Sequence, residues 1–275
     1  MNTFAQRRFV NVTLAVLVAG LLVLFNTLYE MSLRDAAFLN GWLLFAGMVF
    51  LALFNARKKL PFLPLMAAST WLQIHVYLGL ICALLFLLHS DFRLPNGLFE
   101  ILLWATTVAL FVTGTLGLVI SRRLPLRLRS SGGERMLFER IPSFRAQLAN
   151  EAEALAYNSL DETGNTAVAN FYWTVLAPYL RKPRNLLAHL AGSRKHARRL
   201  ENQIRELQRY ENTKGRALLT KLGEITAAKD NLDHQYALQL TMKLWLFFHL
   251  PLSYSVLVLS VVHVGLAYAF GSAAP

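Results

Sequence analysis

Cysteine is almost absent from this sequence. The 275 residues include one, Cys82, which lies inside an apolar run. A single thiol excludes a disulfide framework, a cysteine-rich zinc or iron–sulfur site, and the C-x-x-C-H motif of covalently attached haem. The polar segment 121–242 also lacks G-x-G-x-x-G and G-x-x-x-x-G-K-[ST], so we expect no nucleotide or flavin site there.

Acidic residues are scarce as well, with 16 Asp and Glu against 28 Lys and Arg. Apolar residues instead make up 55% of the chain, and the mean hydropathy is +0.39. This composition is typical of a membrane protein with several spans. About 20 helical residues cross a bilayer core. The apolar runs that meet this length predict five transmembrane helices, at about 9–28, 37–54, 70–90, 98–120 and 243–270.

The basic residues are distributed unevenly among the segments that join these runs. All except Arg34 and Arg93 lie before the first run, between the second and third, or in 121–243. The positive-inside rule places those segments in the cytoplasm, with the N-terminus inside and the C-terminus outside. We therefore predict an all-α bundle in a bacterial-type inner membrane. The net charge of +12 then reflects cytoplasmic loops, and we expect contact with lipid and not with nucleic acid.

The first run follows Arg7 and Arg8, which is also how an export signal begins. Its apolar stretch is longer than a signal-peptide core, and no small-residue cleavage site follows it. We expect an uncleaved helix, with a twin-arginine signal as the alternative.

The predicted domains are 1–120 with four spans, a helical cytoplasmic insert at 121–242, and 243–275 with the fifth span. Within the insert, apolar spacing predicts a helix at 134–158 and a hairpin of 194–211 with 216–242. The aromatic stretch 171–180 is expected to pack on the membrane face or on another insert helix. We expect the insert to cap the cytoplasmic mouth of the bundle, to serve as a docking platform for a partner, or to do both.

Seven histidines are present, and four of them lie in predicted spans. His189, His196 and His234 fall in the polar insert, where we expect them to be solvated. His75 and His89 lie in the third span, and His249 and His263 lie in the fifth.

In both spans the two histidines are fourteen residues apart. Fourteen residues is almost four helical turns, so both side chains share one face about 21 Å apart. The spans run in the same direction, so His75 and His249 should lie at one depth near the cytoplasm. His89 and His263 should then lie near the outer surface. Each pair offers two opposed imidazoles, which is the axial ligand set of one b-type haem.

A single histidine in a membrane span more commonly makes an interhelical hydrogen bond or joins a proton relay. Matched pairs with equal spacing favour ligation of two haem irons. Zinc fits poorly, because the pairs are too far apart to share a tetrahedral site. Gly79 lies between the ligands on the third span and is small enough for a porphyrin to approach the backbone, with helix packing as the interpretation of this glycine taken alone. Gly114 is interpreted as a helix-packing residue.

Basic residues near the two levels are candidate partners for haem propionates. The candidate for the outer haem is Arg93, and the candidates for the inner haem are Arg57, Lys58, Lys59, Arg122, Arg123 and Lys243. Binding of anionic lipid is the alternative for the two juxtamembrane arginines.

At His75, His89, His249 and His263 the sequence resembles dihaem b-type membrane cytochromes, and most closely the transmembrane core of the ferric reductase and NADPH oxidase family, without its flavin domain. The resemblance is confined to the haem-bearing spans. It implies transmembrane electron transfer through two stacked haems.

We therefore predict the membrane cytochrome b subunit of a multi-subunit oxidoreductase. Its partners would be other oxidoreductase subunits, a quinone, a cytoplasmic redox protein or a periplasmic cytochrome c. One alternative is a stand-alone enzyme that oxidises quinol or reduces metal. Another is a haem-free scaffold that recruits partners through the insert.

Overall fold

The chain folds into helices. A computed structural model describes residues 4–32, 36–59, 67–130, 136–163 and 166–270, and no strand occurs in these ranges. The predicted all-α class is therefore confirmed. The chain divides into two compact units, one formed by Met1–Val119 with Leu246–Pro275 and the other by Ile120–Trp245.

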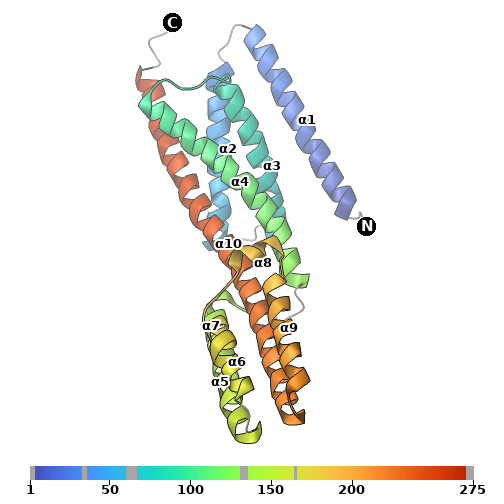
Figure 1. The fold of residues 1–275 in the computed structure, drawn as a ribbon. Coiled ribbons are helices and arrows are strands. Elements are labelled where there is room, and N and C mark those ends of the chain that lie inside the picture. The colour runs from blue at the N-terminus through green and yellow to red at the C-terminus, as the bar shows by residue number, and fades with distance from the viewer. Residues whose placement is uncertain (1–3, 33–35, 60–66, 131–135, 164–165, 271–275) are drawn as a thin grey trace. The chain divides into compact units, whose positions relative to one another are not determined.

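Five of the described helices are long and apolar enough to cross a membrane. They contain the five predicted spans. Five such helices are typical of a multi-pass membrane protein, whose helices are surrounded by lipid. Many large apolar side chains on these helices are exposed, as expected for surfaces that face lipid. The helices are α1 (Phe4–Met31), α2 (Ala36–Lys59), α3 (Ala68–His89), α4 (Leu98–Ser130) and α10 (Thr213–Phe270) (Figure 1).

The closest packing in the first unit joins α2 and α3. A Cβ atom on Gly47 of α2 would lie 2.6 Å from Sγ of Cys82 on α3, so only glycine fits at this crossing. Cys82 is fully buried, in one apolar cluster with Leu85 and with Val256 of α10. The single cysteine of the chain is therefore a packing residue.

Helix α1 is held to α2 through a polar contact. The Asn40 amide of α2 is buried and donates to Oδ1 of Asn26 on α1 at 2.5 Å. The Asn26 amide in turn donates to Glu30 at 2.8 Å. Amide pairs of this kind join transmembrane helices in the absence of water.

Helix α10 runs without interruption from the insert through the fifth predicted span (Figure 1). Pro251 lies inside this helix, two residues after His249. Proline has no backbone N–H, so one hydrogen bond of the helix is missing at this level. The structure places this proline within one continuous helix.

The second unit contains the short helices of the insert. They are η1 (Phe138–Arg140), α5 (Ile141–Thr163), α6 (Ala167–Phe171), the π-helix η2 (Tyr172–Leu176), α7 (Ala177–Leu180), α8 (Leu186–Ala191) and α9 (Lys195–Tyr210). Of the two packing modes expected for the aromatic stretch 171–180, the second is found. Tyr172, Leu176 and Leu180 are buried in one cluster that also contains Ala152 of α5.

The predicted hairpin of α9 with the first part of α10 is confirmed. Leu200 and Ile204 of α9 are buried, and Ile204 packs against Gly223 of α10. Near the turn, the Gln208 amide donates to the hydroxyl of Thr220 at 3.1 Å. The charged faces of α9 remain outside this contact.

Charged side chains form a buried cluster in the second unit. Lys229 and Asp233 of α10 are both fully buried and pair at 2.6 Å. The ammonium group also lies 3.6 Å from the centroid of the Tyr179 ring. Tyr179 donates to Asp230 at 3.4 Å, and burial raises the pKa of its hydroxyl well above the usual range.

The prediction for one histidine of this cluster is wrong. His189 is not solvated: its side chain is 5% exposed, and its Nε2 lies 3.8 Å from Asp230. Burial lowers the pKa of His189, and the nearby carboxylates of Asp230 and Asp233 oppose that shift. His196 is exposed, as the sequence predicts. Polarity of a sequence segment therefore did not reveal which of its histidines is buried.

Candidate functional site

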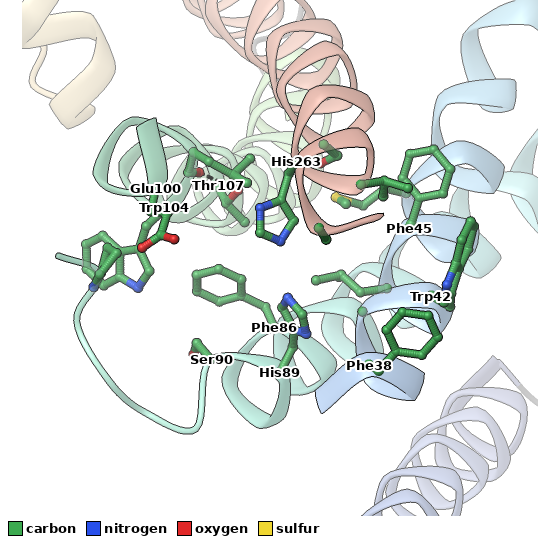
Figure 2. Close-up of a pocket in the computed structure, with 18 of the residues that line it drawn as sticks. Phe38, Trp42, Phe45, Phe86, His89, Ser90, Glu100, Trp104, Thr107 and His263 are labelled. Atoms are coloured by element: carbon green, nitrogen blue, oxygen red, sulfur yellow. Dashed lines mark hydrogen bonds between the residues drawn. The ribbon is translucent and has the colours of Figure 1, made fainter. Parts of the chain in front are cut away.

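The four histidines of the predicted spans meet in two pairs within the first unit. His89 of α3 faces His263 of α10, with ring centroids 6.1 Å apart and ring planes at 85° (Figure 2). His75 of α3 and His249 of α10 lie close enough to interact electrostatically. The structure therefore brings together the pairs that equal spacing predicts.

The orientation of the His89 ring is fixed by a backbone carbonyl. Its Nδ1 lies 2.7 Å from the carbonyl oxygen of Ala37 on α2. A carbonyl only accepts hydrogen bonds, so Nδ1 carries the hydrogen and donates. The lone pair is then on Nε2. Metal-binding imidazoles have the same arrangement, because their other ring nitrogen donates a hydrogen bond to a neighbouring group.

A glycine on α2 makes room for the same ring. A Cβ atom on Gly41 would lie 2.8 Å from Cε1 and 3.0 Å from Nδ1 of His89. These distances are too short for any larger residue unless the ring moves. Ala37 and Gly41 are four residues apart on one face of α2, so one turn of this helix both orients and accommodates His89.

A threonine on α4 holds the His249 ring in the same tautomer. Nδ1 of His249 lies 3.0 Å from the Thr113 hydroxyl, which donates its own hydrogen to the carbonyl of Leu110 at 2.9 Å. The hydroxyl oxygen therefore accepts from Nδ1–H, and the lone pair of His249 is again on Nε2. Gly114, next to Thr113, lies against this ring, since a Cβ atom there would be 3.6 Å from Cε1.

His75 is held by packing. Its ring lies 5.2 Å from the ring of Phe54 on α2. The backbone of Leu51 on α2 also lies within hydrogen-bonding reach of this buried ring.

The two histidine pairs join α3 and α10. Both pairs advance by fourteen residues, so the helices run parallel here and the pairs are about 21 Å apart along the axis. The apolar cluster with Cys82 and Val256 fills the layer between them.

A cavity of about 290 Å³ adjoins the outer pair (Figure 2). Its lining is largely apolar, with a few polar groups at its edge, as in most sites for organic cofactors. The aromatic side chains of the lining are Phe38, Trp42, Phe45, Phe86, Trp104 and Tyr268. Polar lining residues include Ser90, Arg93, Glu100, Thr107 and Ser260.

No family model, curated protein or solved structure matches the chain. The resemblance to dihaem membrane cytochromes therefore stays a prediction from the four histidines. In the described ranges, no three His, Cys, Asp or Glu side chains come together as a metal site. Two imidazoles alone bind a metal weakly, so a metal at either pair would need ligands from elsewhere, such as the pyrrole nitrogens of a porphyrin.

The other predicted site residues lie in different environments. A Cβ atom on Gly79 would meet nothing within 4 Å, so this position leaves open space on α3. Arg93 lines the outer cavity and pairs with Asp91 at 2.9 Å. Arg122 and Arg123 are exposed and belong to the second unit, so their assignment to the inner haem stays a prediction.

Sequence analysis missed the residues on α2 and α4 that surround the histidines. Ala37 and Gly41 were not noticed, and Gly114 was interpreted as a packing residue. The sequence motif Thr113-Gly114, a hydroxyl beside a small residue inside an apolar span, is a local signal that sequence analysis did not use. Ala37 acts through its backbone, which no residue type reveals.

Proposed function

We propose that this chain is a membrane cytochrome b that carries electrons across the bilayer through two bis-histidine haems. His75 and His249 would hold the inner haem, and His89 and His263 the outer haem. The observation that carries the proposal is the pairing of the four rings, two by two, from parallel helices. The resemblance stated above points to the same function.

The geometry of the outer pair fits an iron ligand set. Two imidazoles that bind one metal from opposite sides, each at about 2 Å as in zinc–imidazole bonds, have ring centroids about 6 Å apart. The centroids of His89 and His263 are 6.1 Å apart. The Ala37 carbonyl directs Nε2 of His89, and the Thr113 hydroxyl directs Nε2 of His249, so these two rings are preorganised as ligands.

A bound haem supplies a one-electron carrier, and the residues of the chain set its environment. The aromatic side chains of Phe86 and Trp104 line the outer site and would give a bound haem an apolar environment. Arg93 lines the cavity and pairs with Asp91. With haem bound, Arg93 would pair with a haem propionate in place of the Asp91 carboxylate. The distribution of basic residues supports a bacterial inner membrane with the insert on the cytoplasmic side.

The proposal predicts two haems per chain. The full-length protein, purified in lipid nanodiscs, should show an alpha band in the reduced-minus-oxidised spectrum and two haems per polypeptide in a pyridine extract. A variant with all four histidines replaced by alanine should contain none. A haem-free parent protein of normal helicity would reject the proposal and favour the scaffold alternative. Turnover of quinol or ferric chelate by the isolated chain would favour the stand-alone enzyme.

Gly41→Ala tests the packing around the outer ligand. The new Cβ would displace the His89 ring, because it would lie 2.8 Å from Cε1. We expect the haem content to fall from two towards one per chain, measured by pyridine extraction. Gly20→Ala on α1 is the matched control, since nothing lies within 4 Å of a Cβ atom there. Full haem content and an unchanged spectrum in the Gly41 variant would contradict the role of this glycine.

A further inference from the structure

A second cavity lies between α1 and α3, away from the histidine pairs. Its volume is about 490 Å³. Helix α1 contributes Asn11, Leu14, Ala15 and Val18, α2 contributes Phe50, and α3 contributes Thr70, Gln73, Ile74, Tyr77, Leu78 and Ile81. All of these residues belong to the first unit.

The lining of this cleft is amphipathic along its length. The polar lining residues Asn11, Thr70 and Gln73 lie near the start of α3 and on the facing part of α1, and Tyr77 lies one turn further along α3. The Asn11 amide donates to the Gln73 side-chain oxygen at 3.2 Å. This hydrogen bond leaves the Gln73 amide N–H groups available to another acceptor. Further along both helices the lining is apolar, with Val18 and Ile81.

The exposed surface of α1 gives the cleft access to lipid. Only 6% of the apolar window of α1 is buried, and α1 touches its neighbours far less than α2 and α3 touch each other. A ligand that partitions into the bilayer can therefore enter beside α1 without crossing a packed helix interface.

The cleft and the inner histidine share one helix. Gln73 and Tyr77 are each two residues from His75, so their axial positions differ from it by about 3 Å, and their side chains project about 160° away from it. A ring bound in the cleft would be separated from the site at His75 by the width of one helix, about 10 Å. This separation lies within the range of electron tunnelling.

We propose that the cleft binds the head group of an isoprenoid quinol, which donates electrons to the inner site; this inference rests on the proposed function. The amides of Asn11 and Gln73 and the hydroxyl of Tyr77 match the two oxygens of such a ring. The apolar part of the cleft, with Val18 and Ile81, matches the isoprenoid tail. A lipid acyl chain would fill the apolar part, but it carries no oxygen that could accept hydrogen bonds from the donors at the polar end.

Oxidation of one quinol to quinone releases two electrons and two protons. The first electron would reduce a ferric haem held by His75 and His249. That haem would pass the electron to the haem held by His89 and His263, and the reoxidised inner haem would then accept the second electron. The protons leave from the polar end of the cleft to the water on the side of the basic segments.

A pair of neighbouring substitutions on α1 tests this site. Ala15→Trp fills the cleft, and Val16→Trp is the matched control because Val16 is 65% exposed and lies outside the lining. Helix α1 carries no histidine, so both variants should keep the haem content and the dithionite-reduced spectrum of the parent chain. A short-chain quinol should reduce the haems of the parent and of Val16→Trp at similar rates. Reduction of Ala15→Trp should be at least tenfold slower.

Quinone retained by the chain in nanodiscs gives a readout that needs no haem. We expect about one quinone per chain, by solvent extraction, in the parent and in Val16→Trp, and almost none in Ala15→Trp. Equal quinone content or equal reduction rates in the two variants would overturn the site. A third outcome would identify the occupant of the cleft as lipid. In that outcome dithionite reduces the haems, quinol does not, and the chain retains no quinone. Absence of haem would reject the proposed function, while the quinone content would still decide the cleft.

Discussion

A chain in which His249 is replaced by alanine should bind one haem where the parent binds two. His249 and His75 form the inner pair, and the outer pair lies about 21 Å away across a buried apolar layer. Under the proposed function, loss of one imidazole would remove the haem that this residue holds and would leave the other ligand set intact. The measurement is haem per polypeptide in a pyridine extract, with the alpha band of the remaining haem.

The pairing itself can be tested with the same assay. His75→Ala should give the same residual spectrum as His249→Ala, because both remove the inner haem. His89→Ala and His263→Ala should share a different residual spectrum. His196→Ala in the exposed part of the insert is the control and should keep both haems. Identical residual spectra for His249→Ala and His89→Ala would contradict the assignment of pairs.

The second large effect concerns the stability of the insert. Lys229→Met should lower the free energy of unfolding of the second unit by about 3–5 kcal/mol. The substitution leaves the Asp233 carboxylate fully buried, with the Arg184 backbone N–H at 3.0 Å and the Arg145 guanidinium at 3.9 Å as remaining partners. The Tyr179 ring also loses the ammonium that lies 3.6 Å from its centroid.

Pulse proteolysis of the full-length chain in urea measures this effect, since the insert contains most of the cleavable polar segments. Lys221→Met on the same helix is the control; Lys221 is exposed, and the change should stay within about 0.5 kcal/mol. The double variant Lys229→Met with Asp233→Leu should recover much of the loss, because it removes both buried charges. A single variant as stable as the control would show that the pair contributes little.

Hydropathy made the membrane class and the five long helices predictable. A run of about 20 apolar residues is a local property, and one helix satisfies its own backbone hydrogen bonds whatever lies beside it. The insert hairpin was predictable for a similar reason, since the stripe of Leu200, Ile204 and Leu207 follows helical spacing. Burial of His189 was not, because it depends on α10 supplying Asp230 to α8 from forty-one residues away.

The sequence by itself determined that His75, His89, His249 and His263 form two equally spaced sets, because helical rise and twist convert fourteen residues into one face and a fixed depth. Tertiary structure decided what surrounds each ring. The Ala37 carbonyl, the space at Gly41 and the hydroxyl of Thr113 reach the histidines from α2 and α4, and the register between separate helices is set by packing that no single span encodes. The same packing left the cleft between α1 and α3, whose lining residues lie far apart along the chain.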